Sequence, residues 1–204
     1  MKKLLRLFDP HRQSFFHFKW GFWSALFCFL LVCGLLIHAQ SNFVKAMLSN
    51  MFLYLPNYLI EEFSQRFWCS FTGPWWCYIS GSFTEILIPL VLCLWMLRLR
   101  GGRYLLPVFT YWLATAMYDV GLYVADARAG QLKYTSKDML TVYEAGTVKG
   151  DWYHALNSVG LLEYDLLIGK ILIYCAVICL FVALYSLWYY WTHQSQYVKN
   201  GRWH

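Results

Sequence analysis

The sequence has little charge: Asp, Glu, Lys and Arg make up only 14% of its 204 residues, where a soluble globular domain carries about 25%. It also lacks any Cys-x-x-Cys pair, any glycine-rich phosphate loop and any nucleotide-binding motif. The low charge argues against an ordinary soluble enzyme. The missing motifs argue against a cysteine-only metal site and against nucleotide chemistry.

Apolar and aromatic residues fill the space that charge leaves. They amount to 59% and 21% of the chain respectively, more than a water-soluble domain buries without exposing large apolar patches. The net charge of +6 comes from Lys and Arg scattered around apolar segments, without the stripe that nucleic acid requires. The composition therefore predicts a protein whose solvent is largely the lipid bilayer, with no nucleic-acid partner.

Four apolar runs are long enough to cross a bilayer core, which takes about 20 residues. Trp and Tyr at their edges fit interfacial belts. We therefore expect an all-α, polytopic helical bundle that forms a single domain over residues 1–204. The spans are expected at 20–38, 77–97, 104–125 and 166–190, and an external loop at 126–165.

A fifth segment, 46–72, is too polar for a plain span and too apolar for a loop, because Pro56, Glu61 and Arg66 interrupt its aromatic residues. We interpret it as a re-entrant or interfacial helix. The alternative is a full crossing, which would place the turn at Arg98–Arg103 outside.

The positions of Lys and Arg predict the orientation. Five basic residues precede the first span, three lie in the Arg98–Arg103 turn, and Lys199 and Arg202 follow the last span. With a re-entrant fifth segment, both termini and the arginine turn are cytoplasmic.

Acidic and amide residues at membrane depth are the best pointers to function, because lipid excludes them unless they face protein or a water-filled cavity. Glu61 and Gln65 share one helix face, and Asp119, Tyr123 and Asp126 share another. Simpler explanations exist for some members: Glu61 and Glu62 at headgroup level, Asp126 at a solvated helix end, Asp151 as a helix N-cap and His154 as an interfacial histidine. Further candidates are Glu85, Trp152, Glu163 and Asp165.

At these residues the sequence resembles a family of bacterial membrane proteins that look like intramembrane zinc metallopeptidases. The resemblance covers roughly residues 55–170, and no single motif in it is diagnostic. The matching residues are Ser80, Gly81, Ser82, Ile88, Pro89 and Leu90; Asp119, Tyr123, Asp126, Ala127 and Arg128; and Gly150, Asp151, Trp152, His154, Gly160, Leu161, Leu162, Asp165 and Gly169. It implies a helical membrane bundle in the bacterial inner membrane.

The chain departs from the family at the chemistry. Where the family has His-Glu-x-x-His, this chain has Glu61, Glu62 and Gln65 in the corresponding positions. Only the middle glutamate, the general base of that motif, remains as Glu62, and the histidine that precedes the family's Asp-Trp pair is also missing. The resemblance thus implies a noncatalytic, metallopeptidase-like protein, a pseudoenzyme that acts as a subunit or regulator of a larger membrane assembly.

Two other functions stay open. In a metal-dependent, hydrolase-like membrane enzyme, Glu62 would be catalytic, and Glu61, Asp119, Asp126 and His154 would hold a divalent ion such as iron or manganese. In a membrane thiol oxidoreductase, Cys69 and Cys77 would react.

The two cysteines also fit a simple structural disulfide in an oxidising compartment, or two free thiols. Eleven Trp and sixteen Tyr exceed what interfacial belts are expected to need, which predicts contact with another membrane protein; the alternative is that they form lipid-facing belts and core.

The orientation is testable by thiol labelling. A cysteine introduced at Gly101 should stay unmodified by a membrane-impermeant maleimide in intact cells and react after permeabilisation, because the arginine turn is expected to be cytoplasmic. The unsubstituted protein provides the background from the native thiols. Labelling of Gly101→Cys in intact cells would favour a full crossing by segment 46–72.

Overall fold

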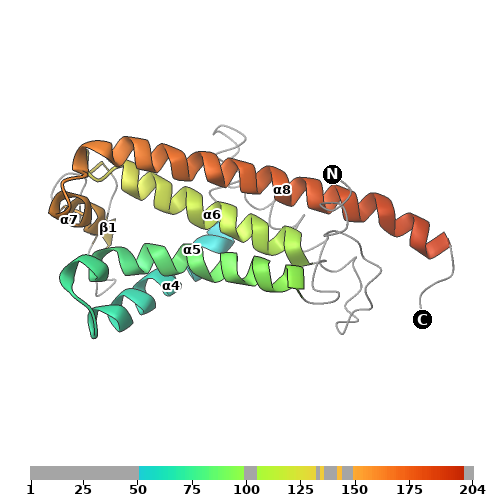
Figure 1. The fold of residues 1–204 in the computed structure, drawn as a ribbon, viewed down its shortest axis with the longest axis horizontal. Helices are drawn as coiled ribbons and strands as arrows, with labels where there is room; N and C mark the ends of the chain where they lie inside the picture. Colours follow the sequence, from blue (N-terminus) through green and yellow to red (C-terminus); the bar gives the residue numbers. More distant parts are fainter. Residues whose placement is uncertain (1–50, 99–104, 132–133, 136–141, 144–148, 200–204) are drawn as a thin grey trace. The chain divides into compact units, whose positions relative to one another are not determined.

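The structure, a computed structural model, describes residues 51–98, 105–131, 134–135, 142–143 and 149–199 (Figure 1). The expected first span at 20–38 and the arginine turn after Arg98 lie outside these residues. The chain divides into two compact units, each considered by itself. One comprises Met51–Ile88 and Thr115–Ala176, and the described parts of the other are 89–98, 105–114 and 177–199.

Helices α4 (Met51–Cys69) and α5 (Pro74–Arg98) are joined by a short turn. Helix α5 begins at Pro74, whose fixed φ angle and missing N–H suit the first position of a helix. A disulfide between Cys69 and Cys77 joins the end of α4 to the first turn of α5. The two helices therefore form a covalently closed hairpin.

Helix α6 (Leu106–Ala125) has no exposed residue along its length. It meets α8 (Asp165–Lys199) through small residues: a Cβ atom built on Gly169 would lie 2.6 Å from the Cβ of Ala125. Val120 and Val124 of α6 form a hydrophobic core with Ala127 and with Leu156 of α7 (Asp151–Ser158). Because the close approach of Gly169 to Ala125 leaves no room for a larger side chain, Gly169 fixes the separation of α6 and α8.

The stretch between α6 and α8 contains regular structure. Strands β1 (Tyr134–Thr135) and β2 (Val142–Tyr143) pair antiparallel, and the 3-10 helix η2 (Leu162–Tyr164) leads into α8. The expected loop at 126–165 is therefore partly structured, because α7 packs Leu156 into the core described above.

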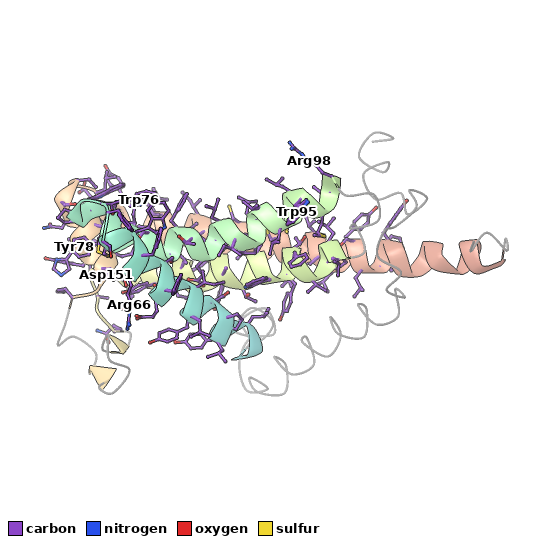
Figure 2. All side chains as sticks on the ribbon, turned by 90° about the horizontal axis from the view of Figure 1, so that it is seen from below. Arg66, Trp76, Tyr78, Trp95, Arg98 and Asp151 are labelled. Carbon is purple, nitrogen blue, oxygen red and sulfur yellow. A yellow bond between two sulfur atoms is a disulfide. The ribbon has the colours of Figure 1, made fainter. Side chains whose placement is uncertain are left out.

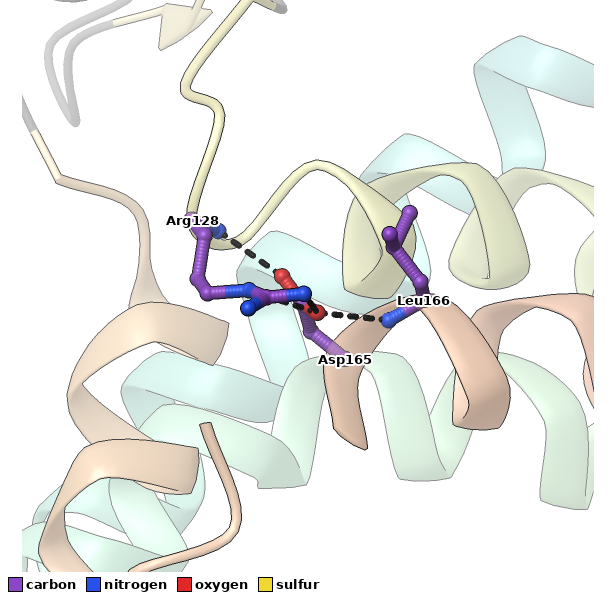
Figure 3. A network of polar contacts seen from close by, with 3 residues as sticks. All are labelled: Arg128, Asp165 and Leu166. Atoms are coloured by element: carbon purple, nitrogen blue, oxygen red, sulfur yellow. Dashed lines mark hydrogen bonds and ion pairs between the residues drawn. The ribbon is translucent and has the colours of Figure 1, made fainter. Parts of the chain in front are cut away.

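An ion pair ties this stretch to the start of α8 (Figure 3). The buried carboxylate of Asp165 accepts hydrogen bonds from the Arg128 Nε (2.9 Å) and backbone N–H (3.1 Å), and from the Leu166 backbone N–H (2.6 Å). The hydrogen bond that the Arg128 side chain donates to Asp165 raises the pKa of Arg128. Asp165 thus satisfies one N–H group at the N-terminus of α8, that of Leu166, and holds Arg128 in the stretch that follows α6.

The helical fold is confirmed, but four spans are not supported. By length and composition, two described helical stretches can cross a membrane. One is α5, and the other is Leu162–Tyr189, which comprises η2 and most of α8. The span expected at 104–125 is absent from this pair because Tyr, Trp, Thr and Asp119 lower the hydropathy of α6, which is enclosed by protein instead. Within 51–69, the segment expected to dip and return is one uninterrupted helix.

We predict that Asp165→Asn lowers the thermal unfolding midpoint in detergent by about 5 °C, since it removes charge-assisted hydrogen bonds from a buried site. Arg66→Gln is the matched control. It breaks the Glu62–Arg66 pair, in which the Arg66 side chain is 65% exposed, and should leave the midpoint nearly unchanged. Equal effects of the two substitutions would contradict the structural role of Asp165.

Candidate functional site

The polar face of α4 points into the protein. Asn57, Glu61 and Gln65 follow each other at intervals of four residues, so they lie along one side of the helix. Asn57 is only 2% exposed, and the side chains of Glu61 and Gln65 are partly buried. Each of the three bonds to a different neighbouring helix.

Three hydrogen bonds connect this face to its surroundings. The Asn57 Nδ2 donates to the Asp119 Oδ2 of α6 at 3.4 Å. The Ser82 hydroxyl of α5 donates to the Glu61 Oε1 at 3.4 Å, and the Gln65 Nε2 donates to the Asp151 Oδ2 of α7. Helix α4 is thus bonded to α5, α6 and α7 through polar side chains.

Two further bonds extend the network at the start of α7. The Trp152 Nε1 donates to the Ser82 Oγ at 3.1 Å, and the Asp151 backbone N–H donates to the Tyr123 hydroxyl at 3.4 Å. In the view of Figure 2, Asp151 is labelled next to Tyr78, near the turn that joins α4 and α5. We call the residues that make these five hydrogen bonds the polar cluster; its members are Asn57, Glu61, Gln65, Ser82, Asp119, Tyr123, Asp151 and Trp152.

Glu85 of α5 lies beside the polar cluster and is 3% exposed. Its electrostatic neighbours are the carboxyls of Glu61 and Asp119. An acidic group with acidic neighbours in a buried place is costly for stability. Glu85 is therefore a buried acidic residue whose position hydrophobic burial alone does not explain.

A close approach between α4 and α5 places Glu61 against Gly81. A Cβ atom on Gly81 would lie 2.8 Å from the Glu61 Cγ and 3.1 Å from the Glu61 backbone oxygen. Only glycine leaves space for this contact, and the next residue along α5, Ser82, supplies the hydrogen bond to Glu61. The Ser80–Ser82 stretch singled out in the sequence therefore acts as a helix-contact site.

The other residues proposed from sequence lie elsewhere. The Asp126 Oδ1 accepts a hydrogen bond from the Gln131 backbone N–H at 2.8 Å, and the His154 ring stacks on Tyr78 with ring centres 5.4 Å apart. Glu62 pairs with Arg66 at 3.6 Å. Over the described residues, no three His, Cys, Asp or Glu side chains form a group that could hold a metal ion. Glu61 and Asp119 thus belong to the polar cluster, whereas Asp126 and His154 make other contacts.

Sequence reasoning missed one member of the polar cluster, Asn57, and named Ser82 without a role in the site. Asn57 had a signal, because it lies one helical repeat before Glu61 on the same face. Ser82 was noted for its Gly-Ser context, but nothing in the sequence indicated its partners Glu61 and Trp152. Cys69 and Cys77, which the sequence left open as a pair or as free thiols, are disulfide-bonded in the structure.

No protein-family model, curated protein or solved structure matches this chain.

Replacing Gly81 tests the helix contact. Gly81→Ala should lower the unfolding midpoint, with a cost of about 1 to 3 kcal/mol for overpacking, because the new methyl group meets the backbone of α4. Gly73→Ala is the control, since a Cβ at Gly73 meets nothing within 4 Å. If both variants melt together with the unsubstituted protein, α4 and α5 do not make the contact described.

Proposed function

We propose that this chain is a noncatalytic, metallopeptidase-like integral membrane protein that acts as a subunit or regulator of a larger membrane assembly. One observation carries the proposal. The side chains at the positions of the degenerate zinc motif all make contacts within the chain: Glu61 with Ser82, Gln65 with Asp151, and Glu62 with Arg66.

These contacts suit a structural role better than a catalytic one. A catalytic zinc site takes three protein ligands and keeps a further position open for water or substrate. Here Gln65, which replaces the second histidine, uses its amide to bond α4 to α7, and Glu61, which replaces the first, accepts a bond from α5. The residues that would form a catalytic site instead join helices.

The membrane placement rests on the two apolar helical stretches, α5 and Leu162–Tyr189. For the orientation, we propose that the end carrying the Cys69–Cys77 disulfide faces an oxidising compartment, where such bonds persist. In a bacterial inner membrane this is the outer side. The arginine turn and both termini are then cytoplasmic, and the four sequence-based spans, with α4 inserted beside them, remain the proposed topology.

The partner is proposed to be another membrane protein. Large aromatic side chains are exposed on α5 and α8, among them Trp95 at 56%, Tyr174 at 66% and Trp188 at 58%. Tyr and Trp are over-represented among the residues that anchor protein interfaces. These side chains offer such anchors within the membrane.

Glu62→Gln separates this proposal from a metal-dependent enzyme. Glu62 is the retained glutamate of the motif and pairs only at the helix surface, so its neutral variant should fold normally. We expect the purified protein and Glu62→Gln to show no stoichiometric metal by elemental analysis, and to elute from mild detergent in the same complex, larger than the 24.2 kDa chain.

Gly81→Ala should weaken that complex, since it disturbs the α4–α5 contact. Stoichiometric metal that is lost in Asp119→Ala while the fold persists would overturn the proposal in favour of the enzyme. Elution of the unsubstituted protein as a single chain would overturn the subunit role.

A further inference from the structure

The exposed face of α4 is apolar. From Tyr54 to Phe63, the exposed residues of the helix are Tyr54, Leu55, Leu59 and Phe63, with exposed fractions of 50% to 76%. The buried residue in this stretch is Asn57. A helix on the surface of a soluble protein has the opposite arrangement, with its apolar stripe inward and its polar side in water. The polar and apolar sides of α4 are therefore reversed relative to a helix on the surface of a soluble protein.

The depth of α4 follows from its contacts with α5. Glu61 lies against Gly81 and accepts a hydrogen bond from Ser82, in the first half of α5. The disulfide holds the end of α4 at the start of α5. Because α5 is one of the two stretches able to cross a membrane, α4 runs back beside it within the same layer. Its 19 residues form a helix about 28 Å long, which is long enough for the returning arm of a re-entrant segment.

The other outward faces of the same unit are also apolar. Phe83 and Leu87 are exposed on α5, and Leu167 and Ile171 on α8. Apolar exposure on three helices indicates a surrounding solvent, whereas a single protein partner would require one patch. An interfacial helix is also excluded for α4, because such a helix turns a basic polar face to water, and the polar face of α4 bonds to α5, α6 and α7.

We propose that Leu55, Leu59 and Phe63 form a lipid-contacting surface, so that α4 lies at hydrocarbon depth with acyl chains as the occupant of its outer face. This inference rests on the membrane placement in the proposed function. Helix α4 is not among the stretches that hydropathy identifies as able to cross a membrane. It can still contact lipid, because its polar side chains form hydrogen bonds inside the protein.

Spin labelling tests the surface. Leu59→Cys and Phe63→Cys are made in full-length protein whose five cysteines outside the disulfide are replaced by Ala, and each variant is labelled with a nitroxide in phosphatidylcholine–phosphatidylglycerol vesicles. We expect collisions with oxygen to exceed collisions with a water-soluble nickel chelate at both sites. Ser70→Cys, in the exposed turn after α4, is the control and should show the reverse.

Two results would overturn the surface. Greater access to nickel than to oxygen at both sites would place α4 in water. Low access to both reagents, with an immobile label, would indicate that a second copy of the chain covers the face. Extraction of the vesicles with alkaline carbonate separates the two proposals: release of the protein defeats the membrane placement itself, whereas retention with a nickel-accessible residue 63 defeats only the assignment of α4.

Discussion

Polar groups satisfied between helices are the constraint on which this molecule depends. In a bundle whose outer faces are apolar, there is no water at the helix contacts to accept an unpaired amide or carboxyl, and a buried polar group without a partner costs about 1 to 3 kcal/mol. Asn57, Glu61 and Gln65 each find a partner on a different helix. Apolar packing alone would let α4 slide or rotate against its neighbours. The three hydrogen bonds can form at the same time in only one position of α4.

Close helix approach makes those bonds possible. Gly81 brings the backbone of α5 to Glu61, and Gly169 brings α8 to Ala125 of α6. Small residues at such crossings are typical of membrane helices, because association there relies on van der Waals contact and interhelical hydrogen bonds. The Arg128–Asp165 pair then closes the end of the same unit, where the chain leaves α6 and later enters α8. A glycine contact and a polar bond thus act together on α4 and α5, and a second glycine contact holds α6 against α8.

The sequence predicted the helical class, the polar residues and their faces, because apolar run length and four-residue spacing are local properties. It did not predict the partners. Spacing places Glu61 and Gln65 on one face, but the distant residues that meet it, Ser82 and Asp151, depend on tertiary packing. Asp126 and His154 were grouped with the site because of their residue types, yet one closes the turn after α6 and the other stacks on Tyr78. The apolar run at 104–125 predicted a span, but α6 has no exposed residue and is not one of the two described stretches that are apolar enough to cross a membrane.

The disulfide at the α4–α5 turn has a consequence for rotation. Each residue of a helix advances its side chains by about 100° around the axis, so a shift of α4 by one residue along α5 would carry Phe63 toward the interior and Glu61 toward the outside. The disulfide joins two cysteines that are eight residues apart in sequence, and Cys69 lies only four residues beyond Gln65. The covalent link therefore restricts the rotation of α4 about its axis. It thereby keeps the polar side of α4 toward the protein and the apolar side outward.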